Sequence, residues 1–178
     1  MTDADKGGEM TRPIIITLQF DAAAADFFEA ERRRHFPPAL NRIPTHLTLF
    51  HALPGEAQDE VMRACAETAA RPAFRVNVDG LMALGRGVAY AVSGGGLLTV
   101  RADLARRFDG MLTRQDREKF RPHVTVQNKV DPQEARALKA ELERTFAPFV
   151  ATAEGLQLWH YDGGPWSPIG AVGFARGG

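Results

Sequence analysis

The chain has 178 residues, of which 44% are hydrophobic and 25% charged, so it is long and apolar enough for one globular domain with a sizeable core. Its 22 Lys and Arg residues balance its 22 Asp and Glu residues, which leaves no overall field for binding genomic DNA or an anionic membrane. The single cysteine, Cys65, excludes an intrachain disulfide and a multi-cysteine metal cluster. The N-terminal residues lack the basic and apolar regions of a signal peptide, and we therefore expect a cytoplasmic protein without a membrane anchor.

The first half of the chain predicts the order strand, helix, strand, helix, strand. Residues 1–12 are expected to form a disordered leader. The expected elements are a strand at 14–20, a helix capped by Asp21 and running to about Arg34, a strand at 46–52, a helix between Pro54 and Pro72, and a strand at 73–85 with a bulge at Gly80. Cys65 falls within the second of these helices and is expected to be a buried apolar residue rather than a reactive thiol.

The second half predicts the same order again. The expected elements are a strand at 87–93, a helix at 96–112, a strand at 122–130, a helix at 131–149 with Pro132 in its first turn, and strands at 150–162 and 166–176 joined by a hairpin at Gly163 and Gly164. Corresponding features recur at offsets of 73 to 78 residues, which predicts an internal duplication with repeats of about 13–85 and 86–175. The predicted fold class is α+β: one bilobal domain over 13–176, with two mostly antiparallel sheets, outer helices and a central cleft.

Two short motifs occupy matching positions in these repeats. They are His-Leu-Thr-Leu at 46–49 and His-Val-Thr-Val at 123–126, and their histidines lie 77 residues apart. Because successive side chains of a strand point to opposite faces, each histidine shares a face with the threonine two residues later, while the apolar residues face the core. A single histidine on a strand is more often a structural hydrogen-bonding group, but two copies at corresponding positions favour a functional site.

A duplicated fold with approximate two-fold symmetry can bring the two polar faces together across a cleft. Two imidazoles would then flank a small volume, each with a hydroxyl beside it. This arrangement suits displacement at phosphorus without a metal, because one imidazole can remove a proton from the nucleophile while the other delivers a proton to the leaving oxygen. The threonine hydroxyls can donate hydrogen bonds to the non-bridging oxygens, where negative charge accumulates.

These two motifs, their spacing and the repeated order of elements resemble the 2H phosphoesterase superfamily, in particular its bacterial 2′-5′ RNA ligase-like (cyclic phosphodiesterase) branch. The resemblance covers about residues 13–175. It implies a bilobal fold with the motifs facing one another, and hydrolysis of 2′,3′-cyclic phosphates of RNA ends or small nucleotides to 2′-phosphates, or the reverse 2′-5′ ligation. It also implies that no metal or other cofactor is needed. We expect the chain to act as a monomer.

Carried over residue by residue, the resemblance makes His46 and His123 the acid–base pair and Thr48 and Thr125 the phosphate-binding residues. It implies that His46 protonates the O3′ leaving group in hydrolysis and that His123 activates the water. Nothing in the sequence itself orders the two histidines. Arg121, two residues before His123, is expected on the same face and is a further candidate for phosphate binding.

The wall that would contact a nucleobase is less well defined by the sequence. The aromatic candidates for base stacking are Phe20, Tyr90 and Trp159, together with Tyr161 and Trp166. Packing in the core is the alternative for each of them. The charged run at 31–35 is expected to be a solvated helix end, with RNA contact as the alternative.

The remaining histidines carry no predicted function. His51 is five residues from His46 and is expected to face the other side of its strand, His35 is expected to end a helix, and His160 is expected to point away from Trp159. The absence of HExxH and CxxC motifs predicts that there is no metal site. Two other functions fit the same residues: a non-catalytic module that binds RNA ends or cyclic nucleotides, and a metal-dependent hydrolase.

Overall fold

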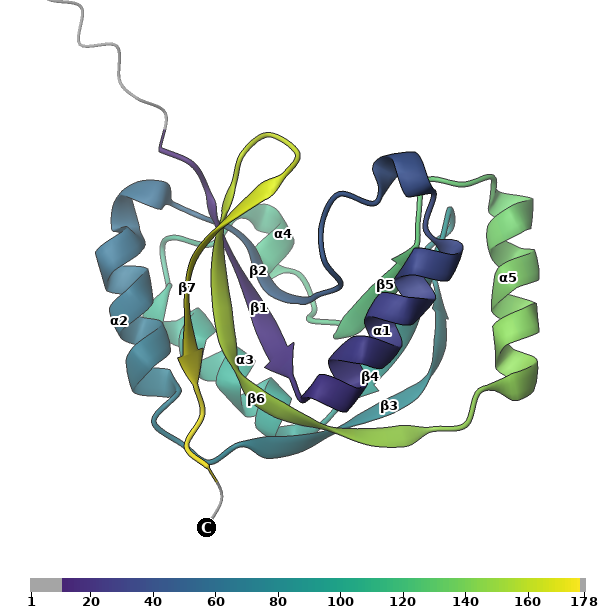
Figure 1. Cartoon of the computed structure of the whole chain (residues 1–178). Coiled ribbons are helices and arrows are strands. Elements are labelled where there is room, and N and C mark those ends of the chain that lie inside the picture. Colours follow the sequence, from purple (N-terminus) through teal and green to yellow (C-terminus); the bar gives the residue numbers. More distant parts are fainter. Residues whose placement is uncertain (1–10, 177–178) are drawn as a thin grey trace, which may run out of the picture.

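The computed structural model describes residues 11–176, so most of the predicted leader lies outside the described residues. In this part of the chain seven strands form one sheet, and all neighbouring strands are antiparallel (Figure 1). The strands are β1 (Ile14–Phe20), β2 (Leu47–Leu53), β3 (Phe74–Ala83), β4 (Val88–Ser93), β5 (His123–Gln127), β6 (Phe149–Tyr161) and β7 (Trp166–Gly173). None of the helices within residues 11–176 is long and apolar enough to cross a membrane.

The order of strands in the sheet is β2-β1-β6-β3-β4-β5, with β7 paired to β6 on the side opposite β1. Strands β1, β2 and β3 of the first half correspond in place to β4, β5 and β6 of the second half. When each strand is exchanged with its counterpart, the same order results, read from the other end of the sheet. The third strand of each half therefore pairs with the first strand of the other half, β3 with β4 and β6 with β1. Each lobe is consequently built from both halves of the sequence.

The longest strand, β6, belongs to both lobes. Its first residues, Phe149–Ala153, pair with β3, and its later part, from Ala153 to His160, pairs with β1. The α+β fold class expected from the sequence is confirmed, with one difference in detail. The two expected sheets are joined into a single sheet, because the 13 residues of β6 are enough to pair with a partner in each lobe.

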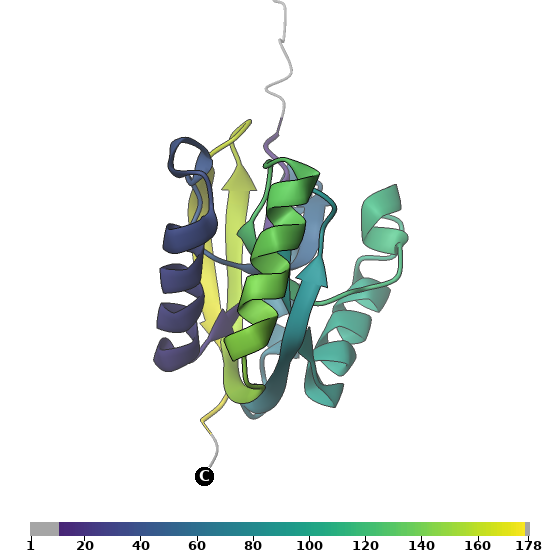
Figure 2. The same cartoon turned by 90° about the vertical axis from the view of Figure 1, so that its right-hand side faces the viewer.

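The helices are distributed between the lobes in the same crossed manner. They are α1 (Ala22–His35), α2 (Gln58–Thr68), α3 (Gly95–Arg107), α4 (Arg114–Arg117) and α5 (Pro132–Thr145), with short 3-10 turns at Pro38–Leu40 and Gly55–Ala57. Helices α2, α3 and α4 lie on the side of β1 and β2, whereas α1 and α5 lie on the side of β3, β4 and β5 (Figures 1 and 2). Helix α1 of the first half therefore packs on β5 of the second half.

Local sequence signals account for most of the helix boundaries. The Asp21 carboxylate accepts a hydrogen bond from the Ala24 amide at 2.9 Å and caps α1, as predicted, and Asp131 caps α5 in the same way. Cys65 is fully buried in α2, where burial raises the pKa of its thiol to about 12. This burial confirms its expected place in the core.

Several boundaries differ from the sequence expectation, and strands β5 and β7 each end three residues earlier than expected. Helix α3 ends at Arg107 rather than at residue 112, and a separate helix, α4, follows after a turn in which Gly110 has a φ of 84°. Helix α5 ends at Thr145 rather than at residue 149. Thr11 and Arg12, which were expected in the leader, are hydrogen bonded to Glu56 and Asp162.

The close pairing of β4 with β5 depends on a glycine at the start of β4. A methyl group at Gly87 would collide with the backbone carbonyl of Gln127 and lie 2.7 Å from the Cα of Asn128, just after β5. We predict that Gly87→Ala lowers the free energy of unfolding by about 1–3 kcal/mol, because backbone atoms must separate to admit it. Chemical denaturation measures this loss. Gly80→Ala is the matched control, since no atom lies within 4 Å of its added methyl group, and equal losses in both variants would contradict the prediction.

Candidate active site

The two motif histidines are anchored in the same way. His46 immediately precedes β2, and its Nδ1 lies 2.9 Å from the carbonyl oxygen of Pro44. His123 is the first residue of β5, and its Nδ1 lies 2.6 Å from the carbonyl oxygen of Arg121. A carbonyl oxygen only accepts, so Nδ1 carries the proton and donates it in both rings. Each ring therefore has a fixed tautomer, with Nε2 left to act on another group.

The motif strands come together although they are far apart in the order of the sheet. Strands β2 and β5 end the six-strand path, yet they are in contact with one another. Thr48 of β2 and His123 of β5 line one cavity of about 240 Å³, and Arg121 lines it with them. The structure thus brings these three predicted site residues into one cavity, with His46 close enough for the charge of His123 to influence its pKa.

Residues of the second motif alternate between cleft and core as expected. Val124 and Val126 are fully buried, whereas His123 and Thr125 are half-buried on the other face. The Thr125 side chain does not line the cavity that contains Thr48 and His123.

Arg32 of α1 holds the backbone of this motif in place. Its Nη1 donates to the carbonyl oxygen of Thr125 at 3.2 Å, and its Nε donates to the Asn41 side chain at 2.8 Å. The guanidinium also lies over the ring of Phe36, 4.0 Å from the ring centre. The sequence placed Arg32 in a solvated helix end, and this is wrong for Arg32 and for Glu31, both of which are buried. Strand β5 covers one face of the end of α1, whereas Arg33 and Arg34 on the other face are exposed as expected.

The electrostatics of the cleft make His46 an unusual histidine. Its pKa is lowered from 6.5 to about 4, first because its surroundings are poorly solvated. The hydrogen bond to Pro44 opposes this effect, whereas the positive charges of Arg32, His123 and His51 add to it. The free protein therefore holds a neutral imidazole at position 46 at physiological pH.

The aromatic candidates fall into two groups. Trp166 lies beside His46, with 4.5 Å between ring centres, and Trp159 lies 6.0 Å from Trp166 and donates its indole N–H to Thr17. Tyr161 and Trp166 also line a second cavity, of about 350 Å³, which shares Thr48 with the first. These aromatic rings form a wall next to the histidine pair.

Phe20 and Tyr90 lie elsewhere. Phe20 packs 5.2 Å from Phe28 in the core. Tyr90 is only 2% exposed, and its hydroxyl donates to Glu31 at 2.7 Å. Neither residue lines the two cavities that contain Thr48, so the structure does not bring them to the histidine pair.

One residue of the cleft was not found from the sequence. His51 was expected to face away from the motif, but it lines both cavities together with Thr48. The reason is an extra residue in β2, because Thr17 pairs with Thr48 whereas its neighbour Ile16 pairs with Phe50. Leu49 and Phe50 are consequently both buried, and the alternation of faces is reversed beyond them.

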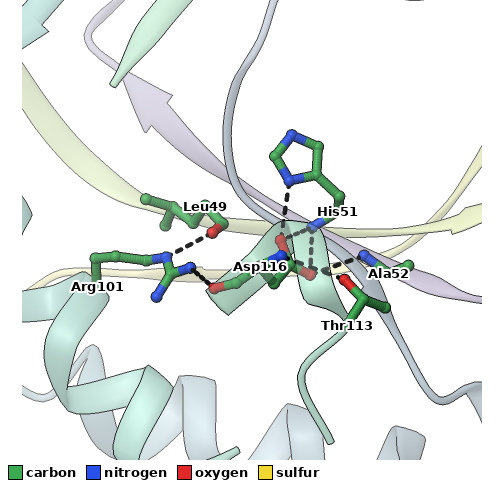
Figure 3. Close-up of polar contacts among 6 residues, drawn as sticks. All are labelled: Leu49, His51, Ala52, Arg101, Thr113 and Asp116. Atoms are coloured by element: carbon green, nitrogen blue, oxygen red, sulfur yellow. Dashed lines mark hydrogen bonds and ion pairs between the residues drawn. The ribbon is translucent and has the colours of Figure 1, made fainter. Parts of the chain in front are cut away.

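His51 is held by a buried carboxylate of α4. Its Nδ1 lies 2.9 Å from Oδ1 of Asp116, and the amides of His51 and Ala52 also donate to this carboxylate (Figure 3). Burial would raise the pKa of Asp116, but these hydrogen bonds outweigh it and the pKa is lowered. Asp116 is therefore ionised and accepts from Nδ1 of His51, which leaves Nε2 of that ring available to another group.

Arg101 of α3 connects β2 to α4. Its Nε donates to the carbonyl oxygen of Leu49 and its Nη2 to that of Asp116, both at 2.7 Å (Figure 3). The guanidinium lies over the ring of Phe50, 4.0 Å from the ring centre. Arg101 thus ties the bulged part of β2 to α4 and fixes the position of both His51 and its carboxylate partner.

The family of the chain follows from comparison with known proteins. A lobed sheet whose two His-x-Thr strands meet at one cavity is the arrangement expected of a 2H phosphoesterase. Residues 20–165 match the model of the 2′-5′ RNA ligase superfamily, and the chain therefore belongs to this superfamily. This match confirms the resemblance stated from the sequence. Within residues 11–176, no three His, Cys, Asp or Glu side chains are grouped so that they could hold a metal ion.

Solved structures show the same fold at low sequence identity. The protein TT0787 of Thermus thermophilus has a TM-score of 0.65 and 14% identity, over 91% of this chain and 97% of that one. A phosphoesterase has a TM-score of 0.62 and 19% identity, over 92% and 99%. Escherichia coli LigT, complexed with 3′-AMP, has a TM-score of 0.61 and 17% identity, over 92% and 98%. No curated protein matches the chain in sequence.

The lowered pKa of His46 predicts a specific acid sensitivity of the fold. The ring titrates near 6.5 when the chain is unfolded and near 4 when it is folded, so at pH 5 only the unfolded state binds the proton. The wild type therefore loses stability from this group as the pH falls from about 6.5 to 4. We predict that His46→Gln reduces the difference in unfolding free energy between pH 7.5 and pH 5 by up to about 2 kcal/mol.

Urea denaturation at a series of pH values measures this difference. Between pH 7.5 and 9 the ring is neutral in both states, so the stability curves of wild type and variant should run parallel there. If the free energy of unfolding fell equally in both proteins between pH 7.5 and pH 5, the His46 ring would be well solvated and the prediction would be wrong.

Proposed function

We propose that the chain is a metal-independent phosphoesterase that hydrolyses 2′,3′-cyclic phosphates of RNA ends or small nucleotides. The observation that carries this proposal is the matching anchorage of His46 and His123, which gives both rings the same tautomer, together with one cavity lined by Thr48 of the first motif and His123 of the second. Thr48 supplies a hydroxyl donor for the phosphate at this cavity, and Arg121 adds positive charge there. Thr125, on the same face of β5 as His123, is the second proposed donor. The 3′-AMP complex of LigT, a protein of the same fold, is consistent with a nucleotide substrate.

The chemistry is an in-line displacement at phosphorus. A water oxygen attacks the phosphorus while its proton passes to Nε2 of one histidine, and the bond from phosphorus to O3′ breaks as O3′ takes a proton from Nε2 of the other. The product carries a 2′-phosphate. The same displacement, with a ribose 5′-hydroxyl in place of water as the nucleophile, gives 2′-5′ ligation.

The electrostatics favour His46 as the base. The family resemblance implied that His46 acts as the acid, but a group with a pKa of about 4 holds no proton to donate in the free protein at neutral pH. A neutral imidazole can accept a proton from water directly. We therefore assign proton removal to His46 and protonation of O3′ to His123.

The partners in this proposal are RNA termini or small cyclic-phosphate nucleotides. Cytoplasmic location and a monomeric state stay predictions from the sequence. A non-catalytic binding module is the alternative function, because the same cavities could hold an RNA end without turnover.

Replacement of either histidine separates catalysis from binding. We predict that His46→Ala and His123→Ala each lower kcat for hydrolysis of 2′,3′-cyclic AMP by about 10²–10⁴, because each removes one proton-transfer group. Binding of the product 2′-AMP should change much less. Phosphorus NMR identifies the 2′-phosphate product, and calorimetry measures the binding.

His35→Ala is the matched control, since His35 lies at the end of α1 beside Glu31 and not in the cleft. Absence of turnover in the wild type, with binding retained, would favour the non-catalytic module. Loss of activity in excess EDTA, restored by a divalent metal, would instead establish a metal-dependent hydrolase.

The pH dependence of kcat/KM tests whether His46 is neutral in the free protein. This ratio reports the free protein, so we predict that its acidic limb has a midpoint near pH 4, where His46 becomes protonated. A steady-state pH series measures this limb. An acidic limb with its midpoint near 6.5, the ordinary pKa of a histidine, would contradict a neutral His46 at pH 5 to 6.

A further inference from the structure

We infer that His51, Lys119 and the cavity between them bind a second phosphate of the substrate, carried on the 5′ oxygen of the nucleoside whose cyclic phosphate reacts. This inference rests on the proposed function and names the substrate class: the 3′ end of an oligonucleotide, or a nucleotide with a 5′-phosphate, rather than a cyclic mononucleotide. His51 would act as a binding residue, and Asp116 as the residue that positions it.

The first support is the place of His51 in the cleft. It lines the polar cavity that contains Thr48 and His123, and also the aromatic cavity that contains Tyr161 and Trp166. A nucleotide with its reacting phosphate at Thr48 and its base against the aromatic wall would lie along both cavities, and His51 lines both of them.

The second support is that the His51 ring is held in position before an anion binds. The side chain of Asp116 is 1% exposed and accepts from the His51 ring and from two backbone amides, so it is fixed before any ligand binds. The His51 side chain is 43% exposed, and its ring extends away from Asp116, which leaves Nε2 accessible (Figure 3). A doubly protonated ring can donate from Nδ1 to Asp116 and, at the same time, from Nε2 to a phosphate oxygen.

The third support is the charge of the same cavity. Besides His51 and His123, it is lined by Lys119 and Arg121, which are exposed, and by one exposed acid, Glu118. The other two charged residues are already engaged, because Asp116 binds His51 and Arg101 binds two backbone carbonyls. Lys119 has no ion-pair partner within residues 11–176. Lys119 and Arg121 are therefore two cations of this cavity that no ion pair engages within residues 11–176, and they can bind two different phosphates.

Binding of two adenosine nucleotides tests the inference without depending on turnover. Adenosine 2′-monophosphate carries only the phosphate of the reacting position, whereas adenosine 2′,5′-bisphosphate adds the second phosphate. We expect the wild type to bind the bisphosphate at least about 10-fold more tightly, as measured by calorimetry. In His51→Ala this preference should shrink by about 10-fold while the affinity for the monophosphate changes less than about 2-fold.

His51→Ala should fold normally, because the ring is exposed and the backbone amide that binds Asp116 remains. Lys119→Ala, at an exposed position, should lose part of the same preference, and His35→Ala should lose none of it. Equal affinity of the wild type for both ligands, or equal losses for both ligands in His51→Ala, would overturn the second phosphate site.

The failure of this inference can be distinguished from failure of the proposed function. If the wild type hydrolyses 2′,3′-cyclic AMP but shows no preference for the bisphosphate, only the second phosphate site is wrong. If the bisphosphate preference and its dependence on His51 are observed without any turnover, the second phosphate site stands and the catalytic proposal is wrong.

Discussion

The whole arrangement depends on how far the sheet curls. Strands β2 and β5 are separated by four other strands in hydrogen-bonding order, yet they are in contact. Strand β6 makes this possible, because it pairs with β3 through one part of its length and with β1 through the other. Two four-stranded lobes then share one strand and face one another, which Figure 1 shows as an open curve. A flat sheet would hold the two motifs apart and leave no common cavity.

Backbone geometry, rather than neighbouring side chains, sets the state of the two motif histidines. Each Nδ1 donates to a carbonyl oxygen two residues earlier, so the tautomer is fixed by the turn that leads into the strand. Such a device needs no carboxylate partner, and it leaves the ring free of a nearby negative charge. For His46 the pKa is low in spite of this hydrogen bond, because burial and the positive charges around it outweigh it. The low proton affinity that leaves His46 neutral at physiological pH is thus a consequence of its burial among positive charges.

The sequence predicted the strands, the paired motifs and the family, because these depend on local alternation and on a repeat that is visible in one chain. It could not predict His51, because a bulge in β2 reverses the alternation and nothing in Leu49 or Phe50 marks that position. The sequence also could not show that Trp166 lies beside the cleft whereas Tyr90 lies in the core. Both are aromatic residues of strands, and only the packing of α1 on the second lobe shows that Tyr90 is enclosed.

The two halves of the chain match in their motif residues but not in the residues around them. His46 and Thr48 have counterparts in His123 and Thr125, whereas the position 77 residues after His51 is Asn128. Trp166 lies on β7, a strand with no counterpart in the first half, and Asp116 lies on α4, where the first half has only the turn at Pro38–Leu40. In the proposed reaction the two oxygens of a cyclic phosphate must be distinguished, and two identical motifs in identical surroundings could not do this. The lowered pKa of His46 and the position of Trp166 beside it make the surroundings of the two motifs unequal, and this inequality can impose the choice.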